Sequence, residues 1–406
     1  MFGSKEQRDF LADDTARKVS QIVFFLTFGF YMILMTASVT SLRYESGPYL
    51  KNIRHMLWIC CGLALVNLIS FCGYTVRQLT VIFLFCALFA FVWLKTGRQE
   101  YLFLQSMMIA FSCRNVQWEK LLRFTFWFWI PLFGTVVALN FLGILPSLTS
   151  ARGDKPRYSL GFSHPNVVGL CCLCFVFLWL LIRYKRLKVY DYLAWLAIAA
   201  FTWNVPNSKT STFLLLLLCI VTLVMKKWGD AFVHSKFMQG LFLSVYPAFA
   251  VLSYLMAYFY TGDSPFYLKL DQVLFSGRLR CARVYFDMYT LTLFGQKIKN
   301  VGTMRAAKKG IPSYILDNFY LRLLINSGII PFLIILALFV ALMYKALQLN
   351  DQSLLIVLII TAVYCVYEFQ STKLIYSITL FQCIYFFFPV RSGEKKRQLN
   401  RTGKKE

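Results

Sequence analysis

Long runs of apolar residues recur along this 406-residue chain, and they constrain its fold more than any other feature. Several extend for about 17 residues or more, the length that a helix needs to cross the hydrocarbon core of a bilayer. In lipid every backbone polar group needs an internal partner, so only helices and closed barrels can span it, and continuous runs of this length favour helices. Only 15% of the residues are charged, whereas a soluble domain carries roughly a quarter. We therefore expect an all-α, polytopic membrane helical bundle.

The pattern predicts about twelve transmembrane helices. The predicted spans are Val19–Thr40, His55–Tyr74, Leu79–Leu94, Tyr101–Ser112, Leu121–Gly143, Pro165–Ile182, Tyr190–Trp203, Thr212–Met225, Met238–Tyr258, Phe319–Tyr344, Leu354–Phe369 and Leu374–Phe388. The fourth is short and contains Gln105, so it is either a crossing or a helix buried in the bundle. The tenth is predicted to be broken near Gly328 and Pro331, since neither residue suits a helix interior.

Basic residues orient the predicted helices. Lys and Arg are retained on the cytoplasmic side of membrane proteins, and basic clusters follow the sixth and eighth predicted spans, at 183–188 and 226–227. They place residues 1–18 and 390–406 in the cytoplasm, as tails of a transmembrane domain over 19–389. The net charge is +25, but no basic soluble module is present, so we expect contact with membrane lipid and no nucleic acid.

The cysteines lie mostly in the predicted spans, and only Cys281 falls in the large predicted outer loop. Such cysteines behave as small apolar side chains. We therefore expect no disulfide framework, no metal site and no cofactor.

One predicted outer loop, residues 260–316, departs from the charge rule. It holds nine basic residues against three acids, a net charge of about +6, whereas outer loops normally carry few Lys and Arg. A loop of this charge favours an anionic ligand. Arg278 and Arg280 follow Ser276 and Gly277, and because the guanidinium fork matches phosphate oxygens, these two arginines are the candidates for holding a pyrophosphate.

Carboxylates lie at the predicted outer ends of two spans. Asp317 opens the tenth, where it is a candidate general base or the N-cap of that helix. Glu368 lies near the outer end of the eleventh, where a charge is either functional or paired with Lys373 or an outer-loop Arg. Arg322 either pairs with one of these acids or reaches the substrate. Asp317 and Glu368 are the candidate catalytic residues, and Asn318 and Arg322 are candidates for binding.

Two shorter segments predicted at the same face add candidates for substrate binding. They are Arg157, His164, Asn166 and Lys209. Pro165 suits the first turn of the sixth span, and Ser163 or His164 can cap it. The free amides of such a helix start attract phosphate, although an ordinary helix cap is the alternative. Lys209, among hydroxyl residues at the start of the eighth span, binds an anion or snorkels to the interface.

Taken in order, these motifs resemble those of the bacterial O-antigen ligase and polysaccharide polymerase superfamily, especially its Wzy-type polymerases. The matching pieces are Arg157 through Gly161-Phe-Ser-His-Pro-Asn166, Asn207-Ser-Lys-Thr-Ser211, Ser276-Gly-Arg278, and Asp317-Asn-Phe-Tyr-Leu321 followed by Gly328. The resemblance covers roughly the fifth to the twelfth span. It implies a metal-independent membrane glycosyltransferase with a GT-C-like fold and one large extracytoplasmic loop.

The resemblance also implies a reaction. Such a polymerase joins oligosaccharide repeat units carried on undecaprenyl pyrophosphate at the outer face of the bacterial cytoplasmic membrane. Arginines would steady the departing pyrophosphate, and a base would activate the acceptor hydroxyl. A chain-length regulator and a flippase are the partner proteins that such a system suggests. The ligases of the superfamily carry His where this chain has Asp317, which favours a polymerase, and Lys209 stands where the motif often has Arg.

Two other functions stay open at this point. A ligase would move a finished glycan to another acceptor. A transporter or flippase of polyanions would place charged groups near the bilayer midplane along a pathway. In this chain nearly all such groups lie at the predicted outer edge, which favours an enzyme.

Overall fold

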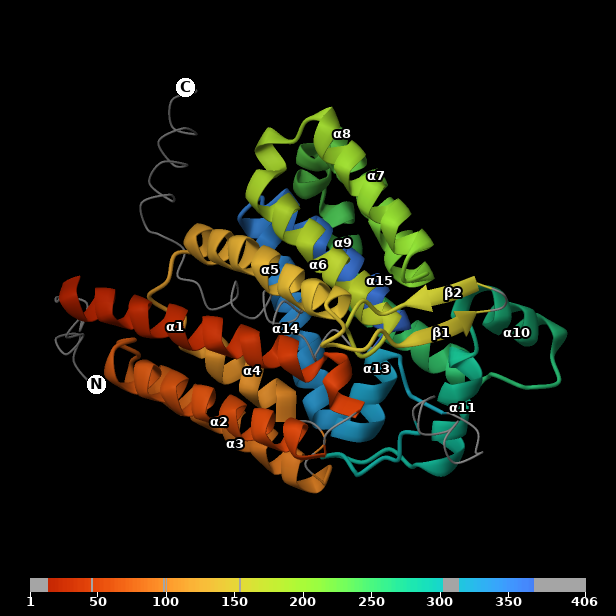
Figure 1. Cartoon of the computed structure of the whole chain (residues 1–406), viewed down its shortest axis with the longest axis horizontal. Coiled ribbons are helices and arrows are strands. Elements are labelled where there is room, and N and C mark those ends of the chain that lie inside the picture. The colour runs from red at the N-terminus through yellow and green to blue at the C-terminus, as the bar shows by residue number, and fades with distance from the viewer. Residues whose placement is uncertain are drawn as a thin grey trace.

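The computed structural model describes residues 14–44, 47–97, 99, 101–152, 155–301 and 314–368. In these ranges the chain folds into a bundle of helices with one two-stranded hairpin (Figure 1). Among the same residues, eight helices are long and apolar enough to cross a membrane. The chain is therefore a multi-pass membrane protein, and the prediction of a polytopic helical bundle is confirmed.

The eight long helices account for most of the predicted spans. They are α1 (Asp14–Ser38), α2 (Gly47–Ser70), α3 (Val76–Lys95), α5 (Trp118–Phe141), α6 (Pro165–Arg183), α8 (Lys209–His234), α9 (Lys236–Tyr258) and α14 (Ile329–Gln348). The twelfth predicted span, Leu374–Phe388, lies outside the described residues.

The remaining described elements are short. They are α4 (Tyr101–Phe111), β1 (Thr149–Arg152), β2 (Lys155–Tyr158), α7 (Val189–Asn204), α10 (Pro265–Leu270), α11 (Arg278–Met288), α13 (Phe319–Arg322) and α15 (Gln352–Tyr367). Both α7 and α15 have 16 residues, or about 24 Å at 1.5 Å per residue. That is less than the hydrocarbon core of about 30 Å, although α7 runs between opposite ends of the bundle, from the basic turn after α6 to Val205 beside Tyr158.

The fourth predicted span is a short buried helix that still returns the chain along α3. At the end of α3, Gln99 Nε2 donates to the carbonyl of Ile298 at 2.8 Å. At its start, Arg114 Nη1 donates to Gln78 Oε1 at 3.0 Å. Between these points α4 is buried over most of Phe103–Phe111, Gln105 included. The helix is thus enclosed by protein, while its two flanks lie at opposite ends of α3.

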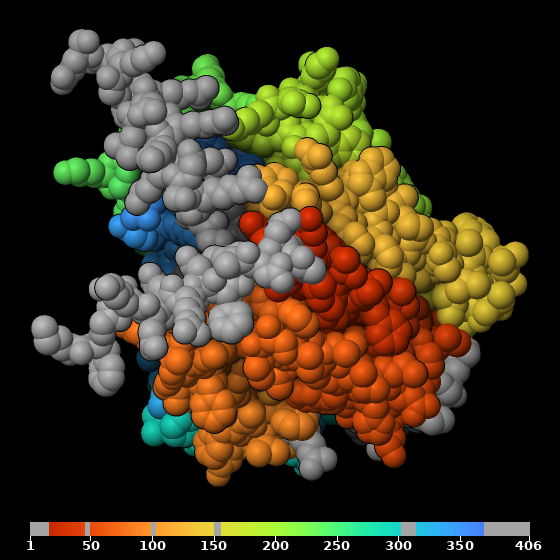
Figure 2. Space-filling view, turned by 90° about the vertical axis from the view of Figure 1, so that its left-hand side faces the viewer, coloured from red at the N-terminus to blue at the C-terminus, as the bar shows by residue number. Residues whose placement is uncertain are grey.

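Helices α6 and α15 form the centre of the bundle. Of the most apolar stretch of α6, 67% of the residues are buried, against 11% for α3, which places α3 at the periphery. Nearly every residue of α15 is buried as well. In Figure 2 the red and orange atoms of α1 to α3 occupy the lower part of the face, and the green atoms of α7 and α8 occupy its top. The two central helices carry polar residues at the ends that meet the hairpin and the large loop.

The tenth predicted span is broken, as expected. After α13 a π-helix runs over Leu323–Ser327, and Gly328 then adopts φ 95° before α14 begins. The outer-loop segment beside the break supplies partners for the freed backbone, because Ile329 N donates to the carbonyl of Thr292 at 2.9 Å. Gly295 also lies against this break, where any added Cβ would be 2.2 Å from the carbonyl of Asn326. The break is thus filled by the large loop.

Three segments that connect predicted spans meet at one end of the bundle. Ser41 N donates to the carbonyl of Gly161 at 2.9 Å, and Ser163 N donates to that of Val39 at 2.8 Å. Tyr158 N donates to the carbonyl of Val205 at 3.2 Å. The turn between α1 and α2, the hairpin with the start of α6, and the turn before α8 therefore share this end, which lies to the right in Figure 1.

Several predicted boundaries are wrong at this end. The second predicted span was expected to begin at His55, but α2 begins at Gly47, because Pro48 suits a first helical turn. The loop over 144–163 contains strands β1 and β2, which pair antiparallel with Ser150 opposite Arg157. The large loop is partly helical, with α10 and α11. The pattern of apolar residues follows burial in lipid, so it marks the hydrocarbon boundary and not the true helix ends.

Candidate functional site

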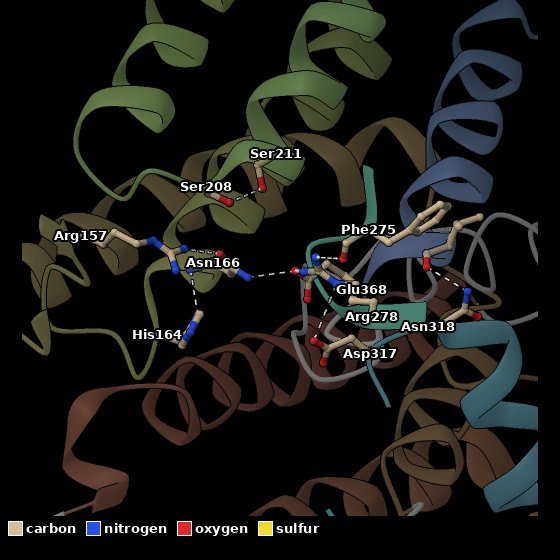
Figure 3. Close-up of polar contacts among 11 residues, drawn as sticks. Arg157, His164, Asn166, Ser208, Ser211, Phe275, Arg278, Asp317, Asn318 and Glu368 are labelled. Carbon is tan, nitrogen blue, oxygen red and sulfur yellow. Dashed lines mark hydrogen bonds and ion pairs between the residues drawn. The ribbon is translucent and has the colours of Figure 1, made fainter. Parts of the chain in front are cut away.

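Five polar side chains from five segments form a continuous chain of contacts at this end of the bundle (Figure 3). In order they are Arg157 of β2, Asn166 of α6, Glu368 after α15, Arg278 of α11 and Asp317 before α13. We call these five residues the Arg157–Asp317 network. Each was a candidate from the sequence, and the fold brings them together across long stretches of chain, with 202 positions between the contacting residues Asn166 and Glu368.

Asn166 joins the two halves of the network. Its Oδ1 accepts from Arg157 Nη2 at 2.5 Å, and its Nδ2 donates to Glu368 Oε1 at 2.9 Å. Arg157 is buried, and its Nε donates to the carbonyl of Pro206 at 3.0 Å. An amide can accept on one side and donate on the other, so Asn166 links a guanidinium to a carboxylate without adding charge.

His164 holds Asn166 in place. It is the N-cap of α6, and its Nδ1 accepts from the backbone amide of Asn166 at 3.1 Å, while Pro165 occupies the first helical turn. The predicted cap by His164 is confirmed. Because Nδ1 accepts, the neutral ring carries its proton on Nε2. One orphan amide of the helix start is thereby satisfied by the protein itself.

Glu368 lies between Asn166 and Arg278. The helix was predicted to continue through Phe369, but α15 ends at Tyr367, and Glu368 has extended backbone at φ −142°. Its side chain is 5% exposed, and Oε1 accepts from both Asn166 Nδ2 and Arg278 Nη2, the latter at 2.7 Å. Pairing with an outer-loop Arg was one of the two interpretations from the sequence, and it is confirmed.

Arg278 contacts both carboxylates of the network. Its Nε lies 3.8 Å from Asp317 Oδ2, and its Nη1 donates to the carbonyl of Phe275 at 3.2 Å. Burial alone would lower the pKa of Arg278, but the negative charges of Glu368 and Asp317 outweigh burial, and its pKa is raised. The guanidinium therefore stays charged, as two nearby carboxylates require.

The turn before α11 sets the position of Arg278. Ser276 and Gly277 both have left-handed backbone, at φ 52° and φ 85°, and they reverse the chain so that Arg278 is the first residue of α11. Asp271 then caps this helix: its Oδ1 accepts from Leu279 N at 2.9 Å and its Oδ2 from Arg280 N at 3.2 Å. Nothing in the sequence pointed to Asp271, because it lies seven residues before Arg278, outside the N-cap position and first turn where helix-start signals are read.

The two carboxylates of the network differ in exposure. The side chain of Asp317 is 28% exposed, whereas that of Glu368 is 5% exposed. A group that exchanges a proton with a substrate must be within reach of it. Asp317 is therefore the carboxylate that an incoming molecule can contact, and Glu368 is placed to orient Arg278 and Asn166.

Asn318 has a structural role, and the alternative role of Asp317 as N-cap is wrong. The N-cap of α13 is Asn318, whose Oδ1 accepts from Leu321 N at 3.0 Å. Its Nδ2 donates to Ser253 Oγ at 3.0 Å and to the carbonyl of Val366 at 2.9 Å. The cap lies one residue later than predicted, so the carboxylate of Asp317 faces Arg278 instead of the helix start.

Three other candidates lie outside these contacts. Lys209 is exposed at the start of α8, and among the described residues no hydrogen bond or ion pair joins its side chain to the network. Arg280 is exposed and meets Asp271 through its backbone amide. Arg322 is buried on α13, within electrostatic reach of Tyr285. Their predicted contact with substrate stays a prediction.

Comparison with other proteins leaves the site to be interpreted from its own chemistry. No protein-family model, curated protein or solved structure matches this chain.

The network combines two kinds of group that act on anionic substrates. Two guanidinium groups offer forked donors of the kind that bind phosphate oxygens, and an accessible carboxylate beside one of them is able to take a proton. In the part of the chain that the structure describes, no three His, Cys, Asp or Glu residues are grouped as metal ligands. The guanidinium groups and the carboxylate of the network themselves offer electrostatic stabilisation of negative charge and proton transfer.

Proposed function

We propose that this protein is a polysaccharide polymerase of the membrane. It would join oligosaccharide repeat units carried on undecaprenyl pyrophosphate by glycosyl transfer, at the outer face of the bacterial cytoplasmic membrane. The observation that carries the proposal is the pairing of Arg278 with an accessible carboxylate, Asp317, at one end of a membrane-spanning bundle.

The division of labour follows from the contacts. Arg278, with its guanidinium already charged and fixed by Glu368, would stabilise the negative charge that grows on the departing pyrophosphate. Fixed donors of this kind act most strongly where charge develops in the transition state. Asp317 would accept the proton of the attacking sugar hydroxyl. The acceptor oxygen forms the new glycosidic bond to the anomeric carbon of the donor sugar. The bond from that carbon to the pyrophosphate oxygen breaks, and undecaprenyl pyrophosphate leaves.

Arg157 and Asn166 would complete the pyrophosphate site on the other side of Glu368 from Arg278. Asn166 already bridges Arg157 to Glu368, so a shift of either arginine is transmitted to the other through hydrogen bonds of 2.5 to 2.9 Å. Holding donors in one geometry lowers the entropic part of the barrier. His164 would support this side of the site by holding the first turn of α6.

The test is the length of polysaccharide made by cells that carry variants of this chain. Arg278→Lys keeps the charge but loses the guanidinium fork, and Asp317→Asn removes the base. Both are expected to remain in the membrane at normal abundance while long polymer disappears. Arg283→Ala and Asp287→Asn serve as controls, because this pair lies on the same helix, α11, and is exposed. Normal chain length in the first two variants would refute the proposal.

A deletion strain separates the polymerase from the two other functions. Without a polymerase, single repeat units reach the outer face on their lipid carrier. A ligase mutant instead accumulates long lipid-linked chains, and a flippase mutant traps single units on the inner side. The accessible carboxylate beside Arg278 favours group transfer over transport, since a transport pathway places charges toward the bilayer midplane.

A further inference from the structure

One exposed face of α2 combines cations and apolar residues in a single stripe. Lys51, His55, Ile59, Gly62, Val66 and Ile69 succeed one another at intervals of three and four residues, and all six are exposed. This spacing places them on one side of the helix. Arg54 is exposed beside Lys51 and His55 at the same end of the stripe. The stripe thus has a basic end and a long apolar part.

The basic end of this stripe lies at the same end of the bundle as the Arg157–Asp317 network. The short helix Ser41–Tyr44 leads into α2, and Ser41 N donates to the carbonyl of Gly161, close before His164 and Asn166. Tyr49 in the first turns of α2 donates its hydroxyl to the carbonyl of Ala37 at 3.0 Å, which fixes α2 against the end of α1.

The apolar part of the stripe has an open notch. Nothing lies within 4 Å of a Cβ built on Gly62, and Ile59 and Val66 on either side are 60% and 55% exposed. In a helix that crosses a membrane, such a face meets hydrocarbon chains. The absent side chain at Gly62 thus leaves a gap between two exposed branched residues, below the cations of the same stripe.

We propose that the α2 stripe docks a membrane lipid, with a diphosphate head on Lys51 and Arg54 and a polyprenyl tail along Ile59, Gly62 and Val66. Charge selects this occupant. The segment from Arg43 to Arg54 carries three permanent cations against one acid, Glu45, an excess that suits a diphosphate better than a phospholipid of single charge. The choice of a diphosphate rests on the proposed function, in which two such lipids meet and the Arg157–Asp317 network holds one of them.

The test measures binding of undecaprenyl diphosphate to the full chain in nanodiscs of neutral phosphatidylcholine, with phosphatidylglycerol as the competing lipid. The double variant Lys51→Ala/Arg54→Ala is expected to weaken one of the two undecaprenyl diphosphate binding events by at least about tenfold, because two charge-assisted contacts are lost, and to leave binding at the Arg157–Asp317 network unchanged. Arg77→Ala is the matched control. Arg77 is exposed on the first turn of α3, next to Gln78, which contacts Arg114 at the other end of the bundle.

A second variant examines the notch and leaves the cations unchanged. Gly62→Phe puts a ring into this gap, at a position where a Cβ has nothing within 4 Å, and weaker binding of undecaprenyl diphosphate is expected. Gly134→Phe is its control, since Gly134 is exposed on α5 and also has nothing within 4 Å. Equal affinity in Gly62→Phe and Gly134→Phe would contradict a path for the tail along Gly62.

Each outcome decides the proposal. Selective loss of undecaprenyl diphosphate from Lys51→Ala/Arg54→Ala supports it. An equal loss of phosphatidylglycerol means that the stripe is a site for anionic phospholipid, and unchanged binding of both lipids means that it is no site; either result overturns the proposal. Failure of the proposed function would give a different result. Polymer would then persist in Asp317→Asn, whichever lipid binds α2.

Discussion

Arg278 Nη2 donates to Glu368 Oε1 at 2.7 Å, and this contact ties the first turn of α11 to the end of α15 across 90 positions of sequence. The two side chains are 13% and 5% exposed. Separating two such buried charges would be strongly unfavourable, because each would lose its closest opposite charge. The pair therefore fixes α11 of the large loop to a central helix of the bundle.

Glu368→Ala is expected to lower the free energy of unfolding by about 3–5 kcal/mol, because it removes the closer carboxylate of the buried Arg278 and leaves only the contact with Asp317 at 3.8 Å. Unfolding in mixed micelles of rising SDS content measures the change. Replacing both partners, as in Arg278→Met/Glu368→Leu, should recover most of the stability without restoring polymer synthesis. Asp287→Ala removes an exposed partner of Arg283 and is expected to change stability by less than about 1 kcal/mol. A loss as large as that of Glu368→Ala would contradict this account.

Asp271→Ala is expected to loosen the start of α11. Asp271 is buried and accepts from the amides of Leu279 and Arg280, and loss of such a cap costs about 0.5–2 kcal/mol. Hydrogen exchange should accelerate over Arg278–Met288, and polymer synthesis should fall because Arg278 is the first residue of that helix. Asp263→Ala, in the preceding exposed turn, should leave exchange in α11 unchanged.

The sequence predicted the members of the network but not their arrangement. Charge in the outer loop pointed to Arg278, and the motif before α6 pointed to Arg157 and Asn166, because those features are local. The contact of Asn166 with Glu368 joins residues 202 positions apart, and no local pattern encodes which carboxylate it meets. Sequence alone therefore left Asp317 and Glu368 with the same role, and only their exposures separate them.

Helix ends were predicted least well, for a physical reason. Hydropathy reports which residues meet lipid or core, so it located α6. The break at Gly328 followed instead from the poor helix propensity of Gly and Pro. It is blind to helical turns that extend beyond the hydrocarbon, such as the first turns of α2, which start at Gly47. It also underrates a buried helix of 11 residues like α4, whose surroundings are protein instead of lipid.

Gly295→Ala is expected to be far more damaging than Gly277→Ala. The two glycines have nearly the same backbone, φ 83° and φ 85°, so the strain of a left-handed Ala, roughly 1–2 kcal/mol, is common to both. A Cβ at 295 would lie 2.2 Å from the carbonyl of Asn326, whereas nothing lies within 4 Å of one at 277. SDS unfolding should show the larger loss for Gly295→Ala, and equal losses would exclude the tight packing of the loop on the broken helix.

Cys281 on α11 is expected to alkylate slowly at neutral pH. Burial raises the pKa of its thiol, and this outweighs the opposing effect of Arg280. Only the thiolate is nucleophilic, so the rate with iodoacetamide should keep increasing as the pH rises past the ordinary range of a thiol. An introduced cysteine at exposed Gly262 should react faster and reach its plateau at lower pH. Mass spectrometry of the two peptides from pH 7 to 10 compares them, and identical profiles would contradict the burial of Cys281.

The two ends of α9 are expected to face opposite sides of the membrane. Lys236 begins this helix directly after α8, whose last turns contain Lys226 and Lys227, and exposed Gly262 follows its end near α10. Because basic residues are retained on the cytoplasmic side, an impermeant maleimide should label Gly262→Cys in intact cells and Lys236→Cys only after permeabilisation, both in a Cys281→Ser background. The reverse pattern would place the Arg157–Asp317 network in the cytoplasm. Lipid-linked repeat units at the outer surface would then be out of its reach, and the polymerase proposal would fail even if every contact of the network were correct.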